Sequence, residues 1–167
     1  TDNGLTWGSA PITPNTTDRL QAFHFIAFDQ EIPTIVYAGD QISTDAGLTF
    51  STIAFPASYT VSGEIPITCG VSQDPVTKKS YVFAIDGNRK IILRSDDHGA
   101  SWFKFFDLST VSGSARFLDS TPTFAAHPSD PNVVFALDAN RDLLKITYNP
   151  LTSVVTTKGL NSFAALP

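Results

Sequence analysis

The 167-residue sequence has little charge, a single cysteine, no methionine and no long hydrophobic run. Cys69 cannot form a disulfide within the chain, so two interpretations stay open: a buried small apolar side chain, or a bridge to another polypeptide. No apolar run reaches the roughly 20 residues of a membrane helix, and no signal peptide is recognisable. We therefore expect no membrane span. The missing methionine leads us to expect a piece of a longer chain.

Charge and histidine content exclude further classes of function. Lys and Arg total 11 against 16 Asp and Glu, a net charge of −5, and the basic residues are scattered along the chain. A nucleic-acid surface needs a basic stripe, so we expect no nucleic-acid partner. His24, His98 and His127 lack the spacing of metal ligands. We therefore expect no metal and no cofactor.

Strand signals dominate the sequence. No stretch keeps apolar residues at helical spacing, so almost no α-helix is expected. Eleven prolines and ten glycines fit short strands joined by tight turns. Runs rich in β-branched and aromatic residues predict strands at 23–28, 34–38, 65–71, 80–85, 90–94, 102–106, 132–137 and 143–148. The segment His127–Asn132, rich in proline and Asx residues, is interpreted as a connecting loop between repeats.

An internal repeat organises these strands. Tyr81–Ile92 (YVFAIDGNRKII) reappears as Val133–Leu144 (VVFALDANRDLL), 52 residues later (133 − 81). A shorter relative, Ile35–Asp40 (IVYAGD), lies 46 residues before it (81 − 35). A period of this size is typical of a four-stranded propeller blade. The charged turns Asp86–Arg89 and Asp138–Arg141 repeat with the strands, so we interpret them as hairpin turns.

A second repeated element runs in step with the first. Its pattern is Ser-x-Asp-x-Gly-x-Ser/Thr-aromatic, at residues 43–50 and 95–102. A truncated copy opens the chain, and a degenerate copy is expected at 147–153, where Asn149 replaces the aspartate. The defining residues are Asp2, Gly4 and Trp7 in the truncated copy; Ser43, Asp45, Gly47, Thr49 and Phe50; and Ser95, Asp97, Gly99, Ser101 and Trp102.

The pattern resembles the Asp-box, or BNR, repeat of sialidases, sortilin-type receptors, xyloglucan-cleaving glycoside hydrolases and photosystem assembly factors. The resemblance covers almost the whole chain. It implies an all-β fold, a partial β-propeller of about three four-stranded antiparallel blades. The expected division is the end of one blade at 1–22, then blades at 23–64, 65–120 and 121–167, the last of them complete or incomplete.

The residue types of the motif indicate a structural role. Asp and Ser side chains accept hydrogen bonds from their own turn backbone. Gly47 and Gly99 are expected to supply a positive φ where a side chain would clash. Phe50 and Trp102 are expected to begin the next strand with an anchoring aromatic. The resemblance places the motif on a hairpin at the outer rim, away from the axial cleft. Its aspartates are therefore expected to be structural.

No catalytic constellation is recognisable. The Arg-Ile-Pro signature of a sialidase first blade is absent, and a chain this short holds at most one of the paired carboxylates of a xyloglucan-type hydrolase. We expect a non-catalytic segment for ligand or protein binding, or for structural assembly, in a secreted or cell-surface protein. The alternative is part of a xyloglucanase- or sialidase-like glycoside hydrolase, so whether the chain is an enzyme stays open.

The expected partners follow from the partial ring. They are the remaining blades of the same protein, a companion chain or symmetry mates, with a carbohydrate or peptide as the ligand class. A ligand is expected at the propeller axis, near the connections between blades and the ends of the innermost strands. The innermost strands are predicted around 23–28, 68–71 and 121–126.

Overall fold

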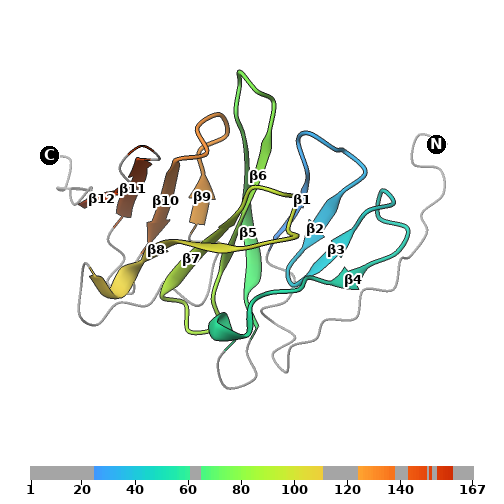
Figure 1. Cartoon of the computed structure of the whole chain (residues 1–167), viewed down its shortest axis with the longest axis horizontal. Helices are drawn as coiled ribbons and strands as arrows, with labels where there is room; N and C mark the ends of the chain where they lie inside the picture. The colour runs from blue at the N-terminus through green and yellow to red at the C-terminus, as the bar shows by residue number, and fades with distance from the viewer. Residues whose placement is uncertain are drawn as a thin grey trace, which may run out of the picture.

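The computed structural model describes residues 25–60, 65–110, 124–137, 143–149, 151 and 154–159, the last range as backbone only. Twelve strands in these residues form three four-stranded sheets that lie side by side (Figure 1). Within each sheet, neighbouring strands are consecutive in the chain and antiparallel. This arrangement confirms the predicted all-β fold of three four-stranded antiparallel units.

The three sheets follow each other along the chain. The first sheet contains β1 (Ile26–Phe28), β2 (Val36–Ala38), β3 (Gln41–Ser43) and β4 (Ser51–Thr52). The second contains β5 (Ile67–Gln73), β6 (Ser80–Ile85), β7 (Ile91–Ser95) and β8 (Phe103–Asp107). The third contains β9 (Phe124–Ala126), β10 (Val133–Leu137), β11 (Leu143–Asn149) and β12 (Val154–Gly159).

Helical structure in the described residues is limited to two short 3-10 turns, η1 (Ala57–Tyr59) and η2 (Leu108–Thr110). No helix there has the length and apolar character needed to cross a membrane. Every run predicted as a strand overlaps one, and β4 follows Phe50, where a strand was expected to begin; β3 and β12 were not predicted. Strand β3 is only three residues long, with one apolar residue between two polar ones, so it carries no periodic signal.

Two apolar junctions hold the three sheets together. Side chains alternate between the faces of a strand, so β6 packs on both neighbours. Its Val82 and Ala84 lie in the core shared with the first sheet, together with Tyr37. Its Phe83, fully buried, lies in the core shared with the third sheet, where its ring meets Phe105 edge-on at 5.4 Å. The second sheet is therefore packed between the first sheet and the third.

The segment His127–Asn132 corrects one expectation. It is the turn between β9 and β10 inside the third sheet, not a connection between repeats. The His127 N–H donates a hydrogen bond of ordinary length, 3.0 Å, to the Val133 carbonyl. The error arose because proline and Asx residues suit a turn within a sheet as well as a connection between sheets.

A second correction concerns register. In the first two sheets, Ser43 and Ser95 lie opposite Val36 and Val82. In the third sheet the matching position, opposite Val134, holds Ile146, so Thr147 does not occupy the serine slot expected of a degenerate motif. A slip of one residue moves every side chain to the other face of a strand. The fully buried Ile146 therefore replaces a turn-forming serine.

Candidate functional site

The two complete motif copies, which we call the aspartate turns (43–50 and 95–102), connect the third and fourth strands of the first and second sheets. In the first turn Ser43 Oγ donates to Asp45 Oδ1 at 2.7 Å, and the Thr49 N–H and Oγ1 donate to the two carboxylate oxygens at 2.8 and 2.6 Å. The Gly47 N–H donates to Ser43 Oγ at 2.8 Å. These bonds close the turn on itself.

The second turn repeats this bonding atom for atom. Ser95 Oγ donates to Asp97 Oδ1 at 2.7 Å, and the Ser101 N–H and Oγ donate to the carboxylate at 2.8 and 2.6 Å. The Gly99 N–H donates to Ser95 Oγ at 2.8 Å. Two sequences that share only the motif residues therefore build the same turn.

Hydrogen bonding keeps both aspartates ionised. The side chain and N–H of Thr49, with Ser43, lower the pKa of Asp45 from 3.8 to about 2. Desolvation raises the pKa of Asp97, but the hydrogen bonds from Ser101 and Ser95 outweigh it and leave the pKa lowered. A carboxylate with a lowered pKa and committed oxygens is a poor general base or acid at neutral pH.

The turn glycines are required by backbone conformation. Gly47 and Gly99 have φ values of 86° and 89°, in the left-handed region. A Cβ added at Gly47 would meet nothing within 4 Å, and at Gly99 only ordinary contacts from 3.7 Å. The positive φ, and not crowding by other parts of the protein, therefore favours glycine at both positions. The preceding residues Ala46 and His98 also have positive φ, 62° and 59°.

The two motif aromatics differ in burial. Trp102, 8% exposed, lies in the core between the first and second sheets, 4.8 Å from the ring of Phe55. Its indole N–H donates to the Gly99 carbonyl at 3.1 Å, which ties the aromatic back to its own turn. Phe50 is only half-buried. The anchor is therefore strong in the second turn and weaker in the first.

The two remaining motif copies provide less structural information. The truncated copy, with Asp2, Gly4 and Trp7, lies outside the described residues. In the degenerate copy, Asn149 Oδ1 accepts a hydrogen bond from the Leu151 N–H at 2.9 Å. Strand β11 runs through Asn149 in register with β12. A strand ladder thus occupies residues that the repeat would place in a turn.

The first strands of the three sheets lie together, since β5 contacts both β1 and β9. These strands fall in the runs predicted to be innermost. Two buried polar residues of β5 bridge to the neighbouring sheets. Thr68 Oγ1 donates to the Gly39 carbonyl at 2.6 Å, and Ser72 Oγ donates to the His127 carbonyl at 2.6 Å. The inner side of the assembly is therefore fixed by hydrogen bonds as well as by apolar contacts.

Other candidate residues have structural surroundings. Asp86 Oδ1 accepts hydrogen bonds from the Lys90 and Ile91 N–H groups at 2.8 Å each, so its charged turn is self-bonded. The matching turn 138–142 lies outside the described residues. Cys69 sits at a register shift of β5 and packs on the second junction, and burial raises the pKa of its thiol. In the described ranges no cluster of three His, Cys, Asp or Glu side chains could hold a metal ion.

Pattern reasoning missed a buried carboxylate at the first junction. Asp29 Oδ2 accepts hydrogen bonds from the Tyr37 hydroxyl at 2.8 Å and from His98 Nδ1 at 2.9 Å, and its Oδ1 accepts two backbone N–H groups. Burial raises its pKa, but these hydrogen bonds outweigh burial and the pKa is lowered. Burial and the bond to Asp29 raise the pKa of Tyr37. His98 thus links an aspartate turn to the adjacent sheet.

Comparison with known proteins supports the architecture. The chain is similar to YCF48 from Cyanidioschyzon merolae, with a TM-score of 0.51 and 17% identity, over 81% of this chain and 35% of that chain. It also matches an ancestral GH74 enzyme, with a TM-score of 0.42 and 19% identity, over 81% of this chain and 19% of that chain. The chain therefore spans about a third of the length of YCF48.

No protein-family model matches the chain, and no curated protein sequence does. Identities this low carry fold information alone. Three consecutive four-stranded antiparallel sheets, with first strands gathered on one side, match the likeness to a β-propeller protein. The chain has the fold of a partial β-propeller whose three sheets are its blades.

Proposed function

We propose that the chain is a segment of an Asp-box β-propeller that acts as a non-catalytic scaffold, for ligand or protein binding or for assembly, in a secreted or cell-surface protein. The observation that carries this proposal is the bonding of Asp45 and Asp97. Each carboxylate is used inside its own turn by equivalent donors at equal distances. A side chain committed in this way stabilises its own hairpin, and both of its oxygens already accept hydrogen bonds from the turn.

The direct test compares catalysis with stability. The chain is incubated with xyloglucan oligosaccharide and with sialyllactose, and released sugar is measured. We expect no hydrolysis, and we expect Asp97→Ala to lower the melting temperature without changing the affinity of any sugar that binds. Hydrolysis by the purified chain would contradict the proposal and support the glycoside hydrolase alternative.

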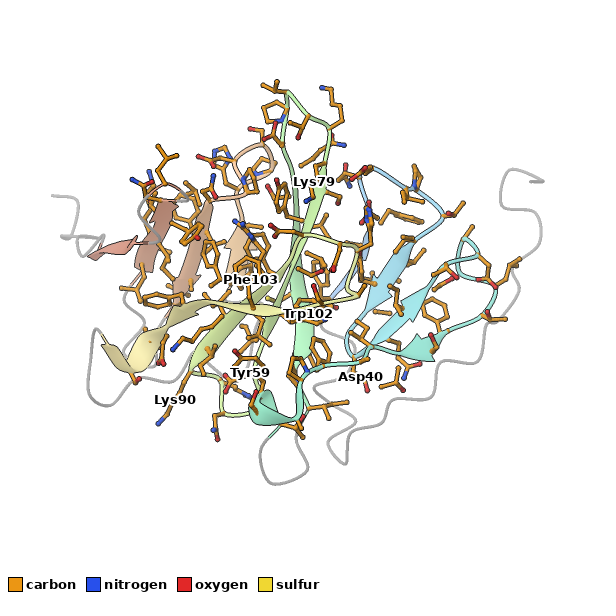
Figure 2. All side chains as sticks on the ribbon, viewed as in Figure 1. Asp40, Tyr59, Lys79, Lys90, Trp102 and Phe103 are labelled. Atoms are coloured by element: carbon orange, nitrogen blue, oxygen red, sulfur yellow. The ribbon has the colours of Figure 1, made fainter. Side chains whose placement is uncertain are left out.

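We propose that a ligand binds at the end of the sheets opposite the aspartate turns. In an antiparallel meander, the first and third turns of a sheet lie at one end, and the second turn and the connection to the next sheet lie at the other. Figure 2 shows Asp40, Tyr59 and Lys90 at this second end and Lys79 at the first. The Tyr59 carbonyl accepts a hydrogen bond from the Gly87 N–H at 3.2 Å, which joins the sheet connection to the β6–β7 turn.

Substituting a lysine at each end of the sheets tests which end binds the ligand. Lys90→Ala and Tyr59→Ala are expected to weaken binding of whichever of the two sugars binds, as measured by calorimetry. Lys79→Ala removes the same charge from the opposite end and serves as the matched control. Equal loss of affinity in Lys79→Ala and Lys90→Ala would contradict the placement.

The proposed assembly role rests on the outer face of the first sheet. Ile26 and Phe28 in β1 are 68% and 57% exposed, whereas their cross-strand neighbours Ala38 and Val36 are buried, so the exposed part of this face lies along β1. In the second and third sheets, the equivalent faces pack on the preceding sheet. Large exposed apolar side chains in a cluster mark an interaction surface. We propose that another propeller blade covers this face.

Association in solution tests this surface. The chain is expected to form species larger than its 18.0 kDa monomer in light scattering. Phe28→Glu is expected to shift the population toward the monomer. Leu48→Glu is the matched control, because Leu48 is 74% exposed on an aspartate turn, away from this face. A wild-type chain that stays monomeric at all concentrations would contradict the assembly role.

A further inference from the structure

The apolar parts of the two junctions are built from equivalent positions. Val82 and Ala84 on one side of the first junction correspond to Val134 and Ala136 on one side of the second. On the facing sides, an aromatic residue stands at the same place, Tyr37 in β2 or Phe83 in β6. Apolar packing of this kind discriminates weakly between one sheet and another as a neighbour. Groups outside this apolar packing must therefore distinguish a native neighbouring sheet from an equivalent sheet of a second copy.

The first junction has a polar link that the repeat does not share. His98, in the aspartate turn of the second sheet, lies with Nδ1 2.9 Å from Asp29 Oδ2 and Nε2 3.7 Å from Glu31 Oε2 of the first sheet. The Asp29 side chain is only 1% exposed. In the first sheet's own turn, the position of His98 holds Ala46, with the same left-handed backbone. The imidazole is thus specific to the second sheet.

The second junction has a different link. Arg94 in β7 is 6% exposed and donates through Nη1 to the Pro131 carbonyl at 3.0 Å and to Asn132 Oδ1 at 3.1 Å, both in the third sheet. Its Nε donates to Asp96 at 2.9 Å. Ile42 holds the position of Arg94 in the first sheet. Four rings lie with their centres 5.0–5.5 Å from the guanidinium carbon: Tyr81, Phe103, Phe105 and Tyr148.

Exchanging the neighbours would remove the hydrogen bonds that His98 and Arg94 make across the junctions, although Arg94 would keep Asp96 in its own sheet. The strand registers place His127 of the third sheet where the first sheet has Asp29, and Thr34 of the first sheet where the third has Asn132. A second sheet that followed the third would put His98 against a histidine instead of a carboxylate. A second sheet that preceded the first would place Thr34 against Arg94, which would lose its hydrogen bond to the Asn132 side chain. A buried hydrogen-bonding group that loses one of its partners is destabilising.

We propose that His98 and Arg94 determine sheet order. Each lets the second sheet pack against one native neighbour and not against an equivalent sheet from elsewhere in the chain or from a second copy. Similar repeats risk exchange between copies, a characteristic failure of repeat proteins. Specificity of this kind is a difference of affinities, reached by making the wrong pairing costly. The partner that fits the second sheet's leading side is therefore a turn with a buried carboxylate.

The test measures exchange between copies. Equal amounts of isotopically light and heavy chain are unfolded in urea and refolded together, and light–heavy hybrids are counted by native mass spectrometry. The double variant His98→Ala/Arg94→Ile introduces the residues of the first sheet. We expect its hybrid fraction to exceed that of the wild type by about threefold or more, because the discriminating links are gone.

Controls separate exchange from loss of stability. Ile92→Val weakens the same sheet at a fully buried position without touching either link. Because the Ile26 and Phe28 face is unchanged in every variant, association through that face contributes equally to all of them. If the double variant does not refold, the single variants are measured, and each is expected to raise hybrids above the Ile92→Val level. Hybrid fractions no higher than in Ile92→Val would overturn the proposal.

Discussion

Replacing Gly70 with alanine should push β5 and β9 apart. A Cβ at Gly70 would lie 2.7 Å from Phe124 Cε1 and 3.1 Å from the Ala126 Cβ. Optimal carbon–carbon contacts are about 3.5–4.0 Å, so the ring must move by roughly 0.8 Å or more. The Ala126 methyl has no rotamer through which to yield. Phe124 is buried in the core of the second junction, where its ring lies 5.8 Å from Phe83.

The expected cost follows from two opposing terms. Overpacking of a filled core costs roughly 1–3 kcal/mol. Removing a glycine also restricts the unfolded chain, which favours folding by about 0.4–1 kcal/mol. The packing term is larger, so Gly70→Ala should lower the free energy of unfolding by about 1–2 kcal/mol. For a chain of this length each kcal/mol corresponds to about 2–4 °C in melting temperature.

Urea unfolding of a double-mutant cycle checks the cause. Phe124→Leu removes the clashing ring edge, so the double variant Gly70→Ala/Phe124→Leu should lose less stability than the two single changes combined. Gly47→Ala is the contrasting control, because its new Cβ has open space and its cost comes from φ. Phe124→Leu should not rescue it. A Gly70→Ala chain as stable as the wild type would refute close contact between these two strands.

Three further outcomes follow from the aspartate turns and their anchor. Asp97→Ala should lower the free energy of unfolding by about 1 kcal/mol, by analogy with losing a helix cap, as measured in urea. Because folding lowers the pKa of Asp45 from 3.8 to about 2, its contribution is present above pH 3.8 and lost as pH falls toward 2. Asp45→Asn should therefore unfold with a shallower acid dependence, and an unchanged one would contradict this. Trp102→Ala should cost about 3–5 kcal/mol in thermal melts, as expected for a buried aromatic.

The sequence predicted the sheets better than their junctions. Apolar runs located every strand of five or more residues except β12, and the repeated motif located equivalent turns. Local chemistry decides both features, so a single sequence suffices. The one-residue slip around Ile146 escaped notice because 138–142 resembles 86–90 in sequence, although the pairs Ile85–Ile92 and Leu137–Leu143 enclose six and five residues. Alignment by similarity does not reveal which face a side chain will take.

The links at the junctions could not be predicted for a different reason. Asp29 and His98 are 69 residues apart, and both stood in segments rich in turn residues, where charged side chains need no special explanation. Arg94 and Asn132 are 38 residues apart. The sequence did contain one sign of a link at a junction. A charged Arg94 at a strand position where the first repeat has Ile42 departs from an apolar pattern, and such a departure needs a partner to be tolerated.

The repeated and the unrepeated residues therefore have separate tasks. Residues that recur, such as Asp45 and Asp97, close each hairpin with the same local bonds and would do so in any sheet. Residues that do not recur, such as His98 and Arg94, form bonds only with a particular neighbour. A chain built from the repeated residues alone would lack the groups that distinguish one neighbouring sheet from an equivalent one. Because order is specified by a few buried polar groups, a change at one of them should alter which sheets meet before it alters whether sheets form.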